Sequence, residues 1–171
     1  MADTTLNATA AALLGLLHDG PMTGGQLMAE ADRRLGSYWS MTRSQVYREL
    51  PALAQSGFVR LGKPGARSSQ PYALTPSGRR AFARWLAEDT GRESIRNPVA
   101  LRAAFGDLQS PNSLAATYAN ATEYHTMALA EVRESVKVMK KDGESFAAAA
   151  QEFAIGYHKA ALAWLRSAPV R

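Results

Sequence analysis

Apolar residues recur at helical spacing along the first third of the chain and predict three helices. The first, about 7–18, carries an apolar stripe of Leu6, Ala10, Leu13, Leu14 and Leu17. Thr23 and Gln26 form a T-x-x-Q pattern, typical of a helix N-terminus, and predict a second helix over about 24–35. The same pattern at Thr42 and Gln45 predicts a third helix over about 43–56.

The third predicted helix has an apolar face and a polar face. Its inward positions are Val46, Leu50, Leu53 and Ala54, and its outward positions are Ser44, Arg48 and Gln55, with Tyr47 on the flank. A proline inside a helix removes one backbone hydrogen bond and tends to kink the axis. We therefore expect a kink at Pro51, on the outer face.

Two short apolar runs, 58–61 and 70–74, predict strands joined by a loop rich in Gly and Pro. Pro71 cannot donate a backbone hydrogen bond, so we expect the second strand to be an edge strand. Thr75 followed by Pro76 is a strong helix start. The helix that it opens has Phe82, Trp85 and Leu86 on its apolar side.

The second half of the chain reads as a separate helical region. A polar stretch at 90–97 predicts a linker between a domain at 1–89 and one at 98–171. Helices are predicted over about 99–105, 112–141 and 145–165. The last has an apolar seam at coiled-coil spacing, made of Phe146, Ala150, Phe153, Tyr157, Ala160 or Ala161, and Trp164.

Composition restricts the class of protein. The 171 residues are 46% hydrophobic, with no uninterrupted apolar run of membrane-spanning length and no secretory signal at the start. The absence of Cys excludes disulfides, thiol catalysis and Cys-based zinc sites, and favours a cytoplasmic location.

The net charge of +5 is unevenly distributed. The segment from Arg33 to Arg84 holds ten cations and one acid, Glu49, for a net charge of +9, while the rest of the chain carries −4. A basic block inside a folded region favours a polyanionic partner. The alternative is an ordinary solvated surface.

Three helices, a two-stranded hairpin and a further helix follow the order of a winged helix-turn-helix, whose third helix enters the DNA major groove. We therefore predict a mainly α fold with a small β-hairpin wing, followed by a helical dimerisation domain. The loop at 62–69 has the chemistry of a wing that approaches phosphates, because it offers Lys63, Arg67, Ser68 and Ser69 without any acid. A solvated hairpin loop is the alternative. The third helix offers Thr42, Arg43, Ser44, Tyr47 and Arg48.

The stretches "ALLGLLHDGPMTGGQLMAEAD", "SQVYRELPALAQSGFVR" and "YALTPSGRRAFARWL" together resemble the PadR family of transcriptional regulators. The resemblance covers about residues 10–88 well, and the ending "YHKAALAWL" is similar to the branch with a larger helical C-terminal domain. Pro51 and Gly25 depart from the family pattern. The resemblance implies a cytoplasmic homodimer that binds an inverted repeat, usually as a repressor. It also implies that a small aromatic effector releases DNA in some members.

Other functions have less support. The seam residues of the last helix are the predicted dimer interface, and Trp85, Tyr118, His125 and Trp164 are candidates for an effector pocket, although aromatic residues at helical spacing more often form a core. His18, His125 and His158 fall on three different predicted helices without metal-binding spacing, so we expect neither an enzyme nor a cofactor or metal. A protein-interaction module without specific duplex recognition is the remaining alternative.

Overall fold

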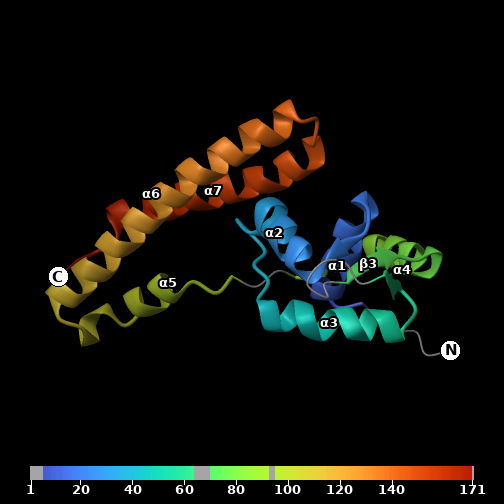
Figure 1. Cartoon of the computed structure of the whole chain (residues 1–171). Coiled ribbons are helices and arrows are strands. Elements are labelled where there is room, and N and C mark those ends of the chain that lie inside the picture. Colours follow the sequence, from blue (N-terminus) through green and yellow to red (C-terminus); the bar gives the residue numbers. More distant parts are fainter. Residues whose placement is uncertain (1–5, 64–69, 93–94, 171) are drawn as a thin grey trace. The chain divides into compact units, whose positions relative to one another are not determined.

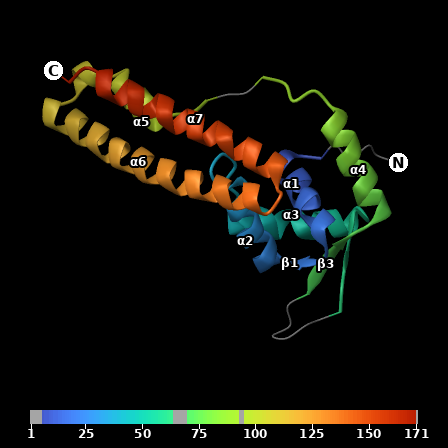
Figure 2. The same cartoon turned by 90° about the horizontal axis from the view of Figure 1, so that it is seen from above.

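The computed structural model describes residues 6–63, 70–92 and 95–170, shown from two directions in Figures 1 and 2. The chain divides into two units, Met1–Gly91 and Arg92–Arg171. Among the helices that the structure describes, none is both long and apolar enough to cross a membrane.

The first unit is built around the leucine stripe of α1 (Ala8–Leu16), which continues into the 3-10 turn η1 (Leu17–Asp19). Leu13, Leu14 and Leu17 are almost completely buried there. They pack with residues of α2 (Gly24–Leu35), α3 (Arg43–Gln55) and α4 (Pro76–Ala87). The predicted helices are confirmed, and the capping boxes of Thr23 and Thr42 are both formed.

The α3 helix continues through Pro51 to Gln55. Val46, Leu50 and Leu53 are buried on its inner side, whereas Pro51 is exposed, as expected. The helix ends before Gly57, whose φ of 71° lies in the left-handed region that favours glycine.

The sheet has three strands, β1 (Met22–Thr23), β2 (Val59–Leu61) and β3 (Pro71–Leu74), in the order β1-β3-β2 with antiparallel pairing. Figure 2 shows β1 beside β3. The expectation that Pro71 lies on an edge strand is wrong, because β3 is the central strand. Pro71 is tolerated there as the first residue of its strand, opposite Thr23, and its carbonyl accepts a 2.7 Å hydrogen bond from the Gly62 N–H.

The second unit is helical and contains α5 (Pro98–Ala103), the 3-10 turn η3 (Gly106–Leu108), α6 (Pro111–Lys141) and α7 (Ser145–Ser167). The long helices α6 and α7 run antiparallel and side by side (Figures 1 and 2). Gly143, with φ of 80°, lies in the turn between them. Buried residues of α6 and α7, including Val132, Val136, Met139, Ala148 and Ala154, form the core.

Candidate nucleic-acid interface

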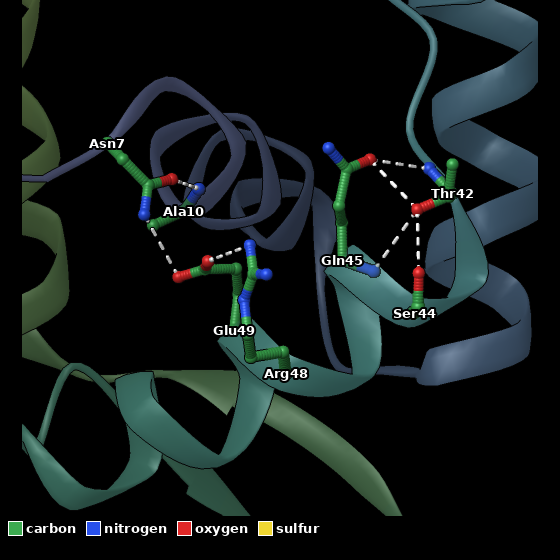
Figure 3. A network of polar contacts seen from close by, with 7 residues as sticks. All are labelled: Asn7, Ala10, Thr42, Ser44, Gln45, Arg48 and Glu49. Atoms are coloured by element: carbon green, nitrogen blue, oxygen red, sulfur yellow. Dashed lines mark hydrogen bonds and ion pairs between the residues drawn. The ribbon is translucent and has the colours of Figure 1, made fainter.

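The N-terminal turn of α3 is held by its capping box (Figure 3). The Thr42 hydroxyl oxygen accepts from the Gln45 backbone N–H at 3.3 Å, and the Gln45 side-chain oxygen accepts from the Thr42 backbone N–H at 2.8 Å. The Thr42 hydroxyl also lies 3.0 Å from the Ser44 hydroxyl. Thr42 is therefore first a capping residue, and it presents Arg43 and Ser44 as exposed side chains.

Tyr47 lies between α3 and the start of α2. Its side chain is half exposed, and its ring packs so close to α2 that a Cβ on Gly24 would lie 3.1 Å from the tyrosine Cζ and hydroxyl oxygen. The Arg43 guanidinium carbon lies 6.0 Å from the ring centroid, within the range of a cation–π contact. Tyr47 thus packs against α2, yet part of its ring stays accessible to a binding partner. The neighbouring Arg43 side chain is accessible as well.

Gly25, the other departure from the family pattern, is exposed, and a Cβ there would meet no atom within 4 Å. A Cβ at residue 25 would therefore not disturb the packing of α2.

Arg48 is exposed on the outer face of α3, next to the buried Glu49. The Arg48 Nη2 lies 3.3 Å from Glu49 Oε1, and the other carboxylate oxygen accepts a 3.1 Å hydrogen bond from the side chain of Asn7 (Figure 3). The sequence identified Glu49 only as the single acid of the basic block. Its role as a contact between Arg48 and Asn7 was missed, because Asn7 precedes it by 42 residues.

The basic block contains fewer free cations than its count suggests. Arg34 forms ion pairs with Asp19 at 2.6 Å and with Glu30, and Arg33 pairs with Glu30 at 2.7 Å. The hydrogen bond from Arg33 lowers the pKa of Glu30 despite the opposing effect of burial. Besides Arg33, the exposed cations of the block among the described residues are Arg43 and Arg48 of α3, Arg60 and Lys63 of the hairpin, and Arg79, Arg80 and Arg84 of α4. Among these, Arg48 lies 3.3 Å from Glu49.

Lys63 follows β2 in the β2–β3 hairpin and is the last described residue before position 64. It is exposed. The other wing residues of the sequence prediction, Arg67, Ser68 and Ser69, lie outside the described residues. The described base of the hairpin is closed by the bond from Gly62 to Pro71. The first unit thus contains α3 followed by the base of the β2–β3 hairpin, which is the order of elements from which the wing was predicted.

The four candidate effector residues are divided between the two units. Trp85 stacks on Phe82, with a ring centroid distance of 6.1 Å, and lines a cavity of about 530 Å³ in the first unit. In the second unit, Tyr118 and Trp164 make an edge-to-face pair at 5.9 Å. His125 is buried and lines a different cavity of about 430 Å³, together with Arg102, Tyr124 and Tyr157. The effector pocket remains a prediction.

Only part of the α7 seam faces α6, because Tyr157 and Trp164 contact His125 and Tyr118 of α6. The side of α7 that is buried within the unit consists of Ala148, Gln151, Ala154, His158, Ala161 and Leu165. In contrast, Phe146 is 91% exposed and Phe153 is 62% exposed, while Ala150, Tyr157 and Trp164 are partly buried. Two large aromatic side chains thus remain in solvent on the predicted dimer face.

Within 6–63, 70–92 and 95–170, no group of three or more His, Asp or Glu residues is arranged to hold a metal ion.

The chain is similar to known transcriptional regulators. The model of the family described as "Transcriptional regulator PadR-like family" matches residues 13–84, which extend from α1 into α4. The negative transcriptional regulator PadR of Bacillus subtilis (strain 168) is 25% identical over 168 residues, covering 91% of this chain and 92% of that protein.

Two solved structures of Bacillus subtilis PadR share the fold. The complex with operator DNA has a TM-score of 0.77 at 24% identity and covers 94% of this chain and 96% of that chain. The complex with p-coumaric acid has a TM-score of 0.70 at 22% identity and covers 95% of each chain. Residues 13–84 thus match the PadR-like family of transcriptional regulators, and the chain as a whole is similar to Bacillus subtilis PadR in sequence and in fold.

Proposed function

We propose that this regulator is a repressor that binds an inverted-repeat operator as a homodimer, with α3 in the major groove and the 62–69 loop on the DNA backbone. The observation that carries the proposal is the outer face of α3. It presents Arg43, Ser44, Tyr47 and Arg48 to solvent from a helix that the core and a capping box hold in place. Arg can bridge the O6 and N7 atoms of guanine, and Ser can pair with several base edges.

The residues of the proposed interface have two kinds of role. Arg43, Ser44 and Arg48 are candidates for base contacts, while Thr42 and Tyr47 are candidates for phosphate contacts near the positive end of the helix. The wing residues Lys63, Arg67, Ser68 and Ser69 are proposed to meet phosphates. Support comes from the Bacillus subtilis relative, which is a negative regulator and has been solved with operator DNA.

The dimer is proposed to form through α7 of the second unit. Within its seam of Phe146, Ala150, Phe153, Tyr157 and Trp164, the exposed Phe146 and Phe153 offer apolar surface that α6 leaves uncovered, and a two-fold pairing would bury it. Two-fold symmetry would place two copies of α3 on two half-sites, which is why we expect an inverted repeat.

Release of DNA is proposed to be controlled by a small aromatic effector. The support is the relative's structure with p-coumaric acid, together with the cavities beside Trp85 and His125. Tyr118 and Trp164 remain candidates, because both lie in one hydrophobic cluster of the second unit.

Selection of bound duplexes from a random pool tests the proposal. The expected product is a palindrome whose half-sites are centred about 10 base pairs, or a multiple of this, apart. Recovery of unrelated sequences with no common motif would contradict specific recognition, and a motif without two-fold symmetry would contradict the dimeric mode. Titration of the bound complex with p-coumarate then tests the effector, because a ligand that binds the free form better must lower operator affinity.

A further inference from the structure

Glu49 occupies an unfavourable place for a carboxylate. It is 9% exposed, and it lies in the helix that carries the proposed DNA-reading residues. A buried carboxylate is costly unless hydrogen bonds compensate it, and a negative charge at a DNA-binding surface opposes the phosphates. The fold nevertheless supplies Glu49 with two partners, Asn7 and Arg48.

Asn7 fixes the position of the carboxylate. Its side-chain oxygen accepts a 2.9 Å hydrogen bond from the Ala10 backbone N–H and so caps α1. With one end of the amide held by this cap, the Asn7 Nδ2 donates to Glu49 Oε2 at 3.1 Å (Figure 3). Because α1 packs in the core of the first unit, the carboxylate is tied to the most buried helix of that unit.

Arg48 is held by the other oxygen of the same carboxylate. Consecutive residues on a helix point in different directions, so a contact between them requires the longer side chain to bend back. The Arg48 side chain is 72% exposed, yet its Nη2 lies 3.3 Å from Glu49 Oε1. An ion pair this exposed contributes little stability. Its consequence is therefore the orientation of a long side chain that would otherwise sample many rotamers.

We propose that Glu49 is a positioning residue for DNA recognition, which orients the guanidinium of Arg48 toward a base edge through a chain of contacts from Asn7. The inference rests on the proposed function, since it needs Arg48 to read a base. A guanidinium has five N–H donors, so a carboxylate at one of them leaves the others available to DNA. The negative charge also weakens the attraction of Arg48 to phosphates, which are the same at every sequence, and so favours contacts that depend on sequence.

Two substitutions separate positioning from a purely structural role. Glu49→Gln keeps the shape and an oxygen that can accept from Asn7, but it removes the charge that holds Arg48. Asn7→Ser keeps a good N-cap for α1, but its side chain is too short to replace the amide contact with Glu49. Neither residue touches DNA in the proposed mode.

The experiment measures the ratio of affinities of the full chain for its selected operator and for a scrambled duplex. It compares wild type, Arg48→Ala, Glu49→Gln, Asn7→Ser and the double variant Arg48→Ala/Glu49→Gln. Loss of one bidentate base contact should lower the ratio of Arg48→Ala by about 5- to 150-fold. Glu49→Gln should lower it by about 2-fold or more, the smaller end of measured couplings between contacting residues, while affinity for scrambled DNA rises. In the double variant Glu49→Gln should add no further loss.

Thermal unfolding of each variant provides the second readout. Asn7→Ser should lower the ratio in the same direction as Glu49→Gln while α1 stays capped, which keeps the test available if Glu49→Gln fails to fold. The inference is overturned if Glu49→Gln lowers the melting temperature without changing the ratio, or changes the ratio equally with and without Arg48. If Arg48→Ala itself leaves the ratio unchanged, the role of Arg48 in the proposed function fails as well.

Discussion

His125 of α6 and His158 of α7 face each other in the buried interior of the second unit, with 2.8 Å between their Nδ1 atoms. One imidazole must donate and the other accept, so the two Nδ1 atoms share a single proton. The rings of Tyr124 and Tyr157 surround the pair in edge-to-face contacts. A second proton between the two Nδ1 atoms would place two N–H donors against each other, so the contact excludes a pair of cationic histidines.

This pair predicts that the second unit loses stability in mild acid. Burial lowers the pKa of both histidines, and the charge of His125 further lowers the pKa of His158. In the unfolded chain the pKa of each imidazole is about 6.5. Below that pH the unfolded state binds more protons than the folded state, so the free energy of unfolding decreases as the pH falls. Above that pH, the contribution of the pair to the free energy of unfolding is fully present.

Urea denaturation at pH 7.5 and 5.5 measures this effect. The double variant His125→Gln/His158→Gln should lose less stability between the two pH values than wild type does. His18→Gln serves as the matched control, because it removes one histidine of the first unit and leaves the pair intact. An equal loss in wild type and the double variant would show that the pair does not respond to acid.

Gly78 predicts a second effect on stability, at the junction of α4 and the hairpin. A Cβ at this position would lie 2.1 Å from the backbone oxygen of Phe58, and backbone cannot yield as a side chain can. The same junction is held by the Thr75 hydroxyl, which donates to the Gly57 carbonyl at 2.7 Å and accepts from the Gly78 N–H. Gly78→Ala should therefore lower the free energy of unfolding by about 1–3 kcal/mol, as overpacking does.

Gly25→Ala is the matched control for that substitution. Gly25 lies in the first turn of α2, and a Cβ there meets no atom within 4 Å. Alanine has the higher helix propensity, so stability should stay the same or increase by up to about 1 kcal/mol. If chemical denaturation gave the same result for both variants, the contact with Phe58 would have no energetic consequence.

Structural features that depend on residues close together in the chain were predicted from the sequence. Thr23 with Gln26, Thr42 with Gln45, and Thr75 with Pro76 lie close together in the chain, and the helices that they begin were predicted within a few residues. The strand β1 was missed because its two residues, Met22 and Thr23, are too few for a periodic pattern. This missing partner also made β3 look like an edge strand, which is why Pro71 was placed wrongly.

Contacts between distant parts of the chain could not be predicted in the same way. The Asn7–Glu49 bond joins residues 42 positions apart, and the His125–His158 bond joins residues 33 positions apart. Each histidine alone reads as a polar residue on an apolar helix face. Only the antiparallel packing of α6 on α7 brings them together, and no local pattern specifies which turn of one helix meets which turn of the other.

The exposed phenylalanines of α7 predict a dimer that one charge would break. Phe153→Glu places a carboxylate in the proposed apolar seam, whereas Lys159→Glu adds a carboxylate to the same helix at an exposed position on a different side. Phe153→Glu should raise the dimer dissociation constant by about 30-fold or more, as loss of a hot-spot residue does. Sedimentation velocity across a concentration series measures this. A wild-type monomer at micromolar concentration, or equal behaviour of the two variants, would contradict the α7 interface.

The last prediction separates the wing from α3, because phosphate contacts do not depend on the DNA sequence whereas base contacts do. Lys63 is exposed at the hairpin and is proposed, with Arg67, to meet phosphates, which are the same at every sequence. Lys63→Ala should release about one fewer counterion on binding, so the slope of log affinity against log salt should decrease in magnitude by about 0.9. Affinity should decrease by nearly the same factor on operator and on scrambled DNA.

Arg48→Ala is the contrasting variant, because a base contact is made only at the correct sequence. Its affinity for operator should fall by about 1–3 kcal/mol, with relaxed preference at one base pair of each half-site. Binding of both variants to both duplexes across a salt series measures the two effects together. If Lys63→Ala changed the ratio of operator to scrambled affinity while Arg48→Ala changed only the salt slope, the two roles would be reversed. If neither variant changed binding, α3 and the hairpin would not be the DNA-binding surface, because a salt-dependent interface cannot lose an exposed cation without a change in slope.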